Sequence, residues 1–130
     1  MADVMSNKQV EAAAIAYVLE YEERNGRVAR DTRHRGEAAD LESSGRIIEV
    51  KAYGKSGRGA DLWLEARQVE EARTNQSFYL YVVEQVCSGN PTLRIIAGQM
   101  LLNLLERARE KRYFEVPLPT SNYDATPIEA

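Results

Sequence analysis

A glutamate and a lysine stand two residues apart within one apolar stretch of this 130-residue chain. The stretch reads RIIEVKAYG, and its β-branched residues predict a strand. Residues two apart on a strand project from the same face, so Glu49 and Lys51 share one face while Ile48 and Val50 share the other. This carboxylate and amine are either the polar surface of an edge strand or part of a reactive site.

A second carboxylate faces the first if the preceding turn is a tight hairpin. Ser44-Gly45 has the composition of a two-residue hairpin turn. Such a turn pairs position 43 with position 46. Continuing this antiparallel pairing away from the turn sets Asp40 opposite Glu49. Carboxylates on opposed residues, with Cβ atoms about 5 Å apart, repel each other unless a cation lies between them. Lys51 is one candidate for that cation, and a divalent metal ion is the other.

This set of residue types suits the hydrolysis of a phosphodiester. Asp40 and Glu49 would bind Mg²⁺ or Mn²⁺, because hard cations prefer oxygen ligands, and the Val50 carbonyl could add another. Such a metal acidifies a water and stabilises charge that develops on the phosphate. Lys51 would orient or deprotonate that water, or neutralise the phosphate.

The composition narrows the other possibilities. The chain has one cysteine, Cys87, and one histidine, His34, which excludes an internal disulfide and a cysteine-based zinc site. A net charge of −3 gives no overall attraction to nucleic acid. No apolar run approaches the roughly 20 residues that span a bilayer, and the N-terminus is too acidic for a secretory signal. We therefore expect a cytoplasmic protein without membrane contact.

Basic residues flank the hairpin on both sides in the sequence. Arg33 and Arg35 precede it, and Lys55 and Arg58 follow it in a glycine-rich loop. We expect these four side chains to contact nucleic-acid phosphates, with simple solvated loops as the alternative.

Hydrophobic periodicity and turn residues predict a small mixed sheet flanked by helices, which is an α/β fold. The length suits a single domain, which we place at residues 1–115 and follow with an extended or loose proline-rich tail at 116–130. The expected elements are a helix at 8–24, strands at 27–32, 39–43 and 46–53, a brief strand at 62–64, a helix at 65–73, strands at 77–86 and 92–97, and a helix at 98–112.

The segment GEAADLESSGRIIEVKAYG resembles the PD-(D/E)XK nuclease superfamily, whose core is restriction-endonuclease-like. More closely, residues from Val10 to Val83 resemble the domain near the C-terminus of NO VEIN proteins, through VEAAAIAYVLEYEERNGR, ADLESSGRIIEVKA, LWLEARQVEEA and FYLYVV. The superfamily resemblance implies that Asp40 and Glu49 are the metal-binding acids and that Lys51 is the catalytic lysine.

Two further site residues follow from the same resemblance. The superfamily often adds an acid from the first helix, for which Glu11 and Glu22 are the candidates. The resemblance favours Glu11, because superfamily sites often take this acid from early in the helix; the alternative for Glu22 is a place in a solvated patch, EYEER. Gln68 stands where the family often has an acid at the start of the second core helix. The residues EAA before Asp40 depart from the usual glycine-aromatic approach.

The resemblance implies a magnesium-dependent endonuclease that acts on DNA, and less readily on RNA, in a defence or repair system. The alternative is a catalytically inactive module of the same fold that binds nucleic acid or a protein partner. A chain this short would depend on a larger targeting protein for its choice of substrate. The leucine stripe of MLLNLLERARE would pack in the core or against a second copy in a homodimer.

Overall fold

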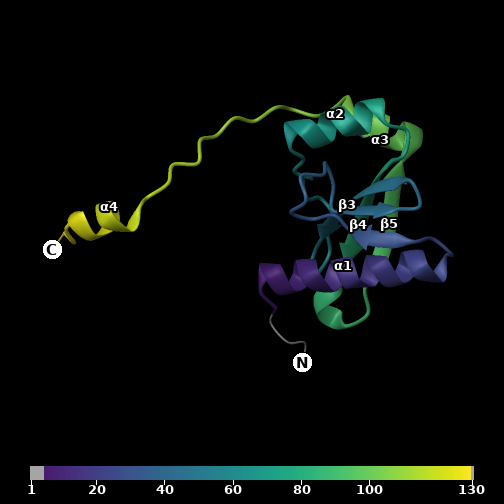
Figure 1. Cartoon of the computed structure of the whole chain (residues 1–130), viewed down its shortest axis with the longest axis horizontal. Coiled ribbons are helices and arrows are strands. Elements are labelled where there is room, and N and C mark those ends of the chain that lie inside the picture. Colours follow the sequence, from purple (N-terminus) through teal and green to yellow (C-terminus); the bar gives the residue numbers. More distant parts are fainter. Residues whose placement is uncertain (1–4, 130) are drawn as a thin grey trace.

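A five-stranded mixed sheet forms the centre of the computed structural model, which describes residues 5–129 (Figure 1). The order across the sheet follows the order in the chain: β1 (Ala29–Asp31), β2 (Leu41–Ser43), β3 (Arg46–Ala52), β4 (Phe78–Glu84) and β5 (Thr92–Ala97). Strands β3 and β4 are parallel, and the other neighbouring pairs are antiparallel. The predicted α/β fold is confirmed.

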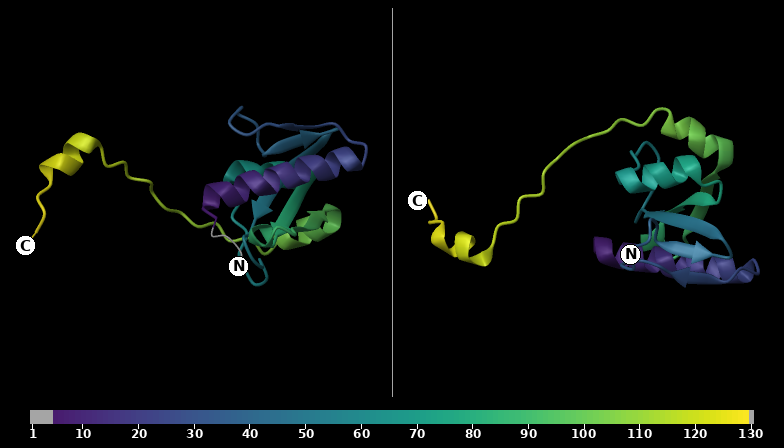
Figure 2. Two further views of the ribbon diagram at one scale, coloured as in Figure 1. Left: turned by 90° about the horizontal axis from the view of Figure 1, so that it is seen from below. Right: turned by 45° about the horizontal axis from the view of Figure 1, so that its top comes forward.

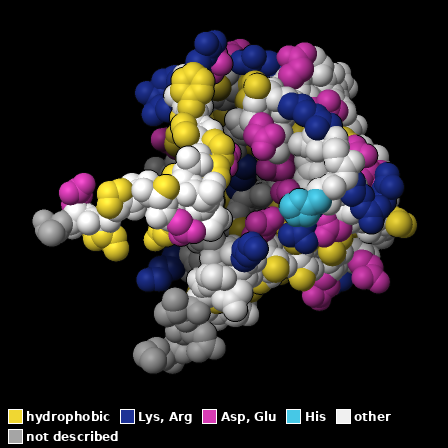
Figure 3. Space-filling model, turned by 60° about the vertical axis from the view of Figure 1, so that its left-hand side comes forward, with side chains coloured by type: hydrophobic (Ala, Val, Ile, Leu, Met, Phe, Trp, Pro, Cys, Tyr) yellow, Lys and Arg dark blue, Asp and Glu magenta, His cyan; other side chains and the backbone are white. Residues whose placement is uncertain are grey.

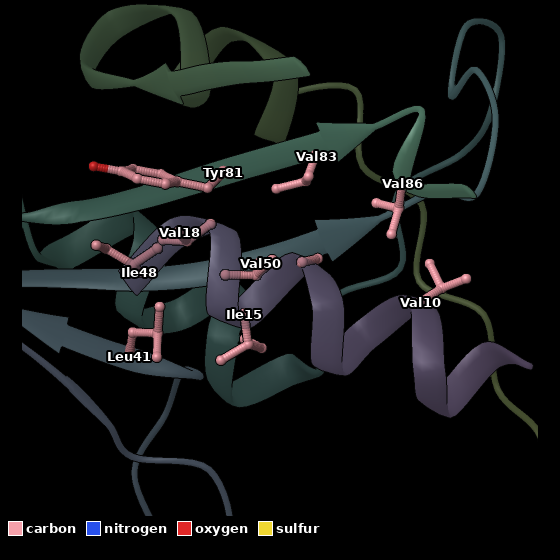
Figure 4. Close-up of a cluster of buried hydrophobic side chains, with 10 residues drawn as sticks. Val10, Ile15, Val18, Leu41, Ile48, Val50, Tyr81, Val83 and Val86 are labelled. Carbon is pink, nitrogen blue, oxygen red and sulfur yellow. The ribbon is translucent and has the colours of Figure 1, made fainter. Parts of the chain in front are cut away.

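Helices cover both faces of this sheet. Helix α1 (Asn7–Arg24) packs on one face, while α2 (Ala66–Thr74) and α3 (Gly98–Leu105) pack on the other (Figure 1). A short 3₁₀ turn, η1 (Val86–Ser88), follows β4. The α1 face holds the larger cluster of buried apolar side chains, shown in Figure 4. None of the helices in residues 5–129 is long and apolar enough to cross a bilayer.

Helix α1 begins and ends where local chemistry predicts. The Ser6 hydroxyl accepts from the Gln9 N–H at 3.2 Å, and the Gln9 side chain accepts from the Ser6 N–H at 2.8 Å. This reciprocal pair satisfies two N–H groups that the first turn leaves free. Asn25 caps the C-terminus, and Gly26 follows with φ of +77°, a conformation that glycine adopts without strain.

The hairpin has the predicted register. Ser44 and Gly45 both have positive φ, at 47° and 92°, as a type I′ turn requires. Leu41 pairs with Ile48, which is the register that the two-residue turn predicted. One further step along this register brings Asp40 to Glu49.

The predicted strand at 62–64 is absent, since these residues are coil. The alternation behind that prediction is nevertheless real: Leu62 and Leu64 pack into the cluster beneath α2 and α3, whereas Trp63 is 61% exposed. The segment lies extended without a neighbouring strand to pair with.

Helix α3 ends at Leu105, seven residues before its predicted end at Arg112. Leu101 and Leu105 are buried, and the next residues, ERAREKR, contain no large apolar side chain that would continue this stripe. Most helical stability in proteins comes from burying such a face, so the helix stops where its apolar face stops. Every residue from 106 to 129 is exposed, and a short helix, α4 (Thr120–Ala125), lies within this segment.

Candidate functional site

Glu49 is buried, although its sequence pattern is also that of an exposed edge strand. Its side chain is 7% exposed, and its neighbour across the parallel pair is the core residue Leu80. Strand β3 is an interior strand between β2 and β4, so its charged face is not the solvated surface of an edge. A carboxylate in such a place is costly unless it is paired or binds a cation.

Asp40 is bound to the same strand by its own side chain. Its Oδ2 accepts from the Val50 N–H at 2.9 Å, and its backbone carbonyl accepts from the Thr32 N–H at 2.8 Å. The carboxylate therefore replaces a strand partner for Val50 just before β2 begins. This bond holds the Asp40 carboxylate beside Glu49.

Lys51 supplies one of the two positive charges that the ionised pair of Asp40 and Glu49 needs. The Lys51 Nζ lies 3.1 Å from Glu49 Oε2, and the lysine side chain remains 22% exposed. The other carboxylate oxygen, Glu49 Oε1, is buried and has no hydrogen-bond partner among the described residues. A buried oxygen without a donor is rare, because its desolvation is not compensated.

Burial and the nearby charge of Asp40 raise the pKa of Glu49 to about 7, against the opposing effect of Lys51. The ionised pair of acids is thus short of positive charge. The donor set fits Mg²⁺, which binds through one or two carboxylates and keeps several waters. No group of three His, Cys, Asp or Glu side chains in residues 5–129 is arranged to bind a metal, so two carboxylates are what this site offers.

An open hollow of about 620 Å³ is lined by these groups. Its lining residues include all three members of the set and come from α1, the residue before β2, β3, the loop after β3 and η1: Glu11, Asp40, Glu49, Lys51, Tyr53, Lys55 and Cys87 among them. Figure 3 shows the molecule from the side on which α1 begins, where acidic and basic side chains are mixed around a recess. The hollow is within the size range of small-ligand sites.

Residues 10–96 match the family model described as Protein NO VEIN, C-terminal. The chain belongs to this family. The match starts in α1 and ends in β5, so it includes the hairpin and every predicted site residue. Searches of curated proteins and of solved structures gave no match.

Glu11 and Glu22 are the two candidate acids in the first helix of this NO VEIN C-terminal domain, and their surroundings differ. Glu11 lines the hollow, is 55% exposed on its side chain, and lies 3.4 Å from Arg33 Nη1. Glu22 is fully buried at the other end of α1, against Arg27 and Tyr81. The alternative of a solvated patch for Glu22 is therefore wrong; one of its donors, Tyr81, lies 59 residues away and gave no signal near Glu22 in the sequence.

The remaining predicted site residues of the NO VEIN C-terminal domain are Gln68 and four basic residues, and of these only Lys55 lines the hollow. Gln68 is buried in α2, where its Oε1 accepts from the Glu65 N–H at 3.0 Å; it is not among the residues that line the hollow. Arg33 is bound to Asp31 at 2.7 Å. The other three basic residues are exposed, and Lys55 among them lines the hollow: Arg35, Lys55 and Arg58.

One residue that sequence reasoning missed anchors the glycine-rich loop. Glu84, at the end of β4, accepts from the Gly57 N–H at 2.7 Å and from Arg94 Nε at 2.9 Å, and these bonds lower its pKa. A Cβ at Gly57 would lie 2.7 Å from the Tyr53 ring, so only glycine permits this close packing. These hydrogen bonds hold the loop beside the hollow. The one signal for this role in the sequence was that Glu84 is an acid at the end of a buried strand.

Proposed function

We propose that this domain is a metal-dependent phosphodiesterase that cleaves DNA, with a restriction-endonuclease-like core and the active-site set of the PD-(D/E)XK superfamily. One observation carries the proposal. With both carboxylates ionised, Glu49 Oε1 is buried with no donor among residues 5–129, next to the Asp40 carboxylate and in the lining of an open hollow. A purely structural ion pair would have its oxygens satisfied.

Each side chain has a role that follows from its position. Asp40 and Glu49 would hold Mg²⁺ or Mn²⁺ between them. When bound, the ion lowers the pKa of a coordinated water and offsets charge on the phosphate. Lys51, 3.1 Å from Glu49 and partly exposed, would orient the attacking water or neutralise the phosphate. Glu11 and Lys55, on the rim of the same hollow, would position water and the DNA backbone.

The test is cleavage of single- and double-stranded DNA, and of RNA, in the presence of Mg²⁺ or Mn²⁺. We expect wild-type cleavage of DNA to fall at least about 100-fold in Lys51→Ala and in Asp40→Ala, the scale of a lost acid–base or charge-stabilising group. Glu23→Ala is the matched control, because Glu23 is an exposed acid outside the hollow. Cleavage that survives both site substitutions contradicts the proposal.

A second function, binding without catalysis, is favoured by the small number of metal-binding acids at the site and by the net charge. The described residues offer no cluster of three metal-binding side chains, and the chain carries a net charge of −3. Both fit an inactive module that binds nucleic acid or a protein partner through the same hollow. Binding of DNA without cleavage, weakened by Lys55→Ala and indifferent to Mg²⁺, would identify that function instead.

A further inference from the structure

The last part of the chain exposes apolar side chains that no other described residue buries. We name residues 113–129 the arm. Its large apolar side chains are between 66% and 98% exposed: Tyr113, Phe114, Val116, Leu118, Tyr123 and Ile128. The arm runs away from the body in each view of Figures 1 and 2. Exposed apolar surface on this scale marks an interaction site.

A matching apolar surface lies on helix α3. Met100 and Leu104 stand one turn apart and are 62% and 41% exposed, while Leu101 and Leu105 on the same helix are buried in the core. We name Met100 and Leu104 the α3 face. Residues four apart share one side of a helix, so these two form a single apolar strip that the chain itself leaves uncovered.

The charges next to the two surfaces are opposite. The arm contains three acids, Glu115, Asp124 and Glu129, and no lysine or arginine. The segment between α3 and the arm carries four exposed basic residues and two acids: Arg107, Arg109, Lys111 and Arg112 against Glu106 and Glu110. An acidic arm laid on α3 would therefore meet this basic segment, and such complementarity steers and orients association.

The segment just before the arm contacts the loop that precedes α2. Lys111 Nζ lies 5.9 Å from the centroid of the Trp63 ring, on the loop before α2, which is a cation–π distance. From there the chain extends outward, and residues 113–119 alone reach about 23 Å at 3.3 Å per residue. The arm thus has the reach to contact another molecule.

We propose that the arm binds the α3 face of a second copy of this chain, and that the two copies exchange arms. Reciprocal exchange is a closed, twofold arrangement in which each copy gives one arm and receives one. It buries both apolar surfaces and brings each acidic arm against a basic segment. The dimer does not depend on the metal or on cleavage, so it stands apart from the proposed catalytic function.

The full-length chain tests this exchange through two variants that cannot pair with themselves. Phe114→Asp with Val116→Asp disables the arm, and Met100→Glu with Leu104→Glu disables the α3 face. Val28→Asp is the control, since Val28 is 79% exposed and lies in neither surface. Sedimentation velocity should show a dimer for wild type and control, and at least tenfold weaker dimerisation for each variant alone, with circular dichroism confirming that all remain folded.

Mixing the two variants is the decisive step. One carries an intact arm and the other an intact face, so one of the two contacts re-forms and the mixture should yield a heterodimer weaker than the wild-type dimer. A mixture that stays monomeric while wild type dimerises overturns the exchange. A monomeric wild type at the highest soluble concentration, including one in which the arm binds a different protein, overturns it as well.

Discussion

Three glutamates are buried among residues 5–129, and two of them, Glu22 and Glu49, have opposite surroundings. Glu22 receives two hydrogen bonds from Arg27, both 2.7 Å long, and a third from the Tyr81 hydroxyl at 2.9 Å. Glu49 has one amine, from Lys51, a second acid beside it, and an oxygen with no donor among the described residues. Burial raises the pKa of both acids; hydrogen bonds outweigh it at Glu22, whose pKa is lowered, and Asp40 adds to it at Glu49.

The contrast is the one expected between an acid that serves only the fold and an acid that binds something from solvent. A buried acid that serves only the fold is surrounded by donors, since each unsatisfied oxygen costs stability. An acid that must bind something from solvent keeps an oxygen free and accepts that cost, which is typical of functional sites. Glu22 is of the first kind, and we propose that Glu49 is of the second.

The largest effect on stability should come from Glu22→Gln. Neutralising Glu22 leaves the Arg27 charge without its partner, so we expect the free energy of unfolding to fall by about 3 kcal/mol. The matched change, Glu49→Gln, removes the repulsion with Asp40 and should leave stability equal or higher. Urea denaturation measures both. Equal losses in the two variants would show that the two acids serve the fold alike.

Magnesium should stabilise the wild-type protein against unfolding. A ligand that binds the folded state at 100 times its dissociation constant adds about 2.7 kcal/mol. Thermal unfolding with and without Mg²⁺ should show this gain in wild type and in Glu22→Gln, and no gain in Asp40→Asn or Glu49→Gln. A gain that persists in Asp40→Asn would place the ion elsewhere.

The Glu22 network should weaken in acid. The folded-state pKa of Glu22 lies below the ordinary value of 4.5, so its contribution is present above about pH 4.5 and is lost as the pH falls through the folded-state pKa. The stability gap between wild type and Glu22→Gln should therefore be constant near neutrality and shrink below pH 4.5. Denaturation at a series of pH values checks this; a gap that widens in acid would reverse the assignment.

The smallest effect concerns one donor to Glu22. Tyr81→Phe removes the hydroxyl that bonds Glu22 and accepts from Arg46 at 2.9 Å, and it should cost about 1.5 kcal/mol. Tyr79→Phe is its control, because Tyr79 interacts through its ring, 4.3 Å from the Arg46 guanidinium carbon, and a phenylalanine ring keeps that contact. Equal costs would show that the Tyr81 hydroxyl is not what secures Glu22.

The features that the sequence predicted correctly depend on neighbours in the chain. The Ser44-Gly45 turn requires positive φ at both residues, and that local need set the register that brings Asp40 to Glu49. Helix α1, expected from residue 8, begins at Asn7 for a similarly local reason, the capping box of Ser6 and Gln9. A turn and a cap each act over two to four residues, so their residue types are sufficient signals.

Other features were decided by contacts between distant segments. Glu22 is buried because Tyr81, 59 residues away, donates to it, and α3 stops at Leu105 because its apolar face has no further core to cover. Two other features likewise depend on which strands lie side by side. They are the Glu49 oxygen that has no donor among the described residues and the hydrogen bond from the Gly57 N–H to Glu84. The sequence by itself determined which carboxylates oppose each other across the hairpin. Which buried acid is satisfied was decided only by the tertiary structure, because its donors come from other elements of the fold.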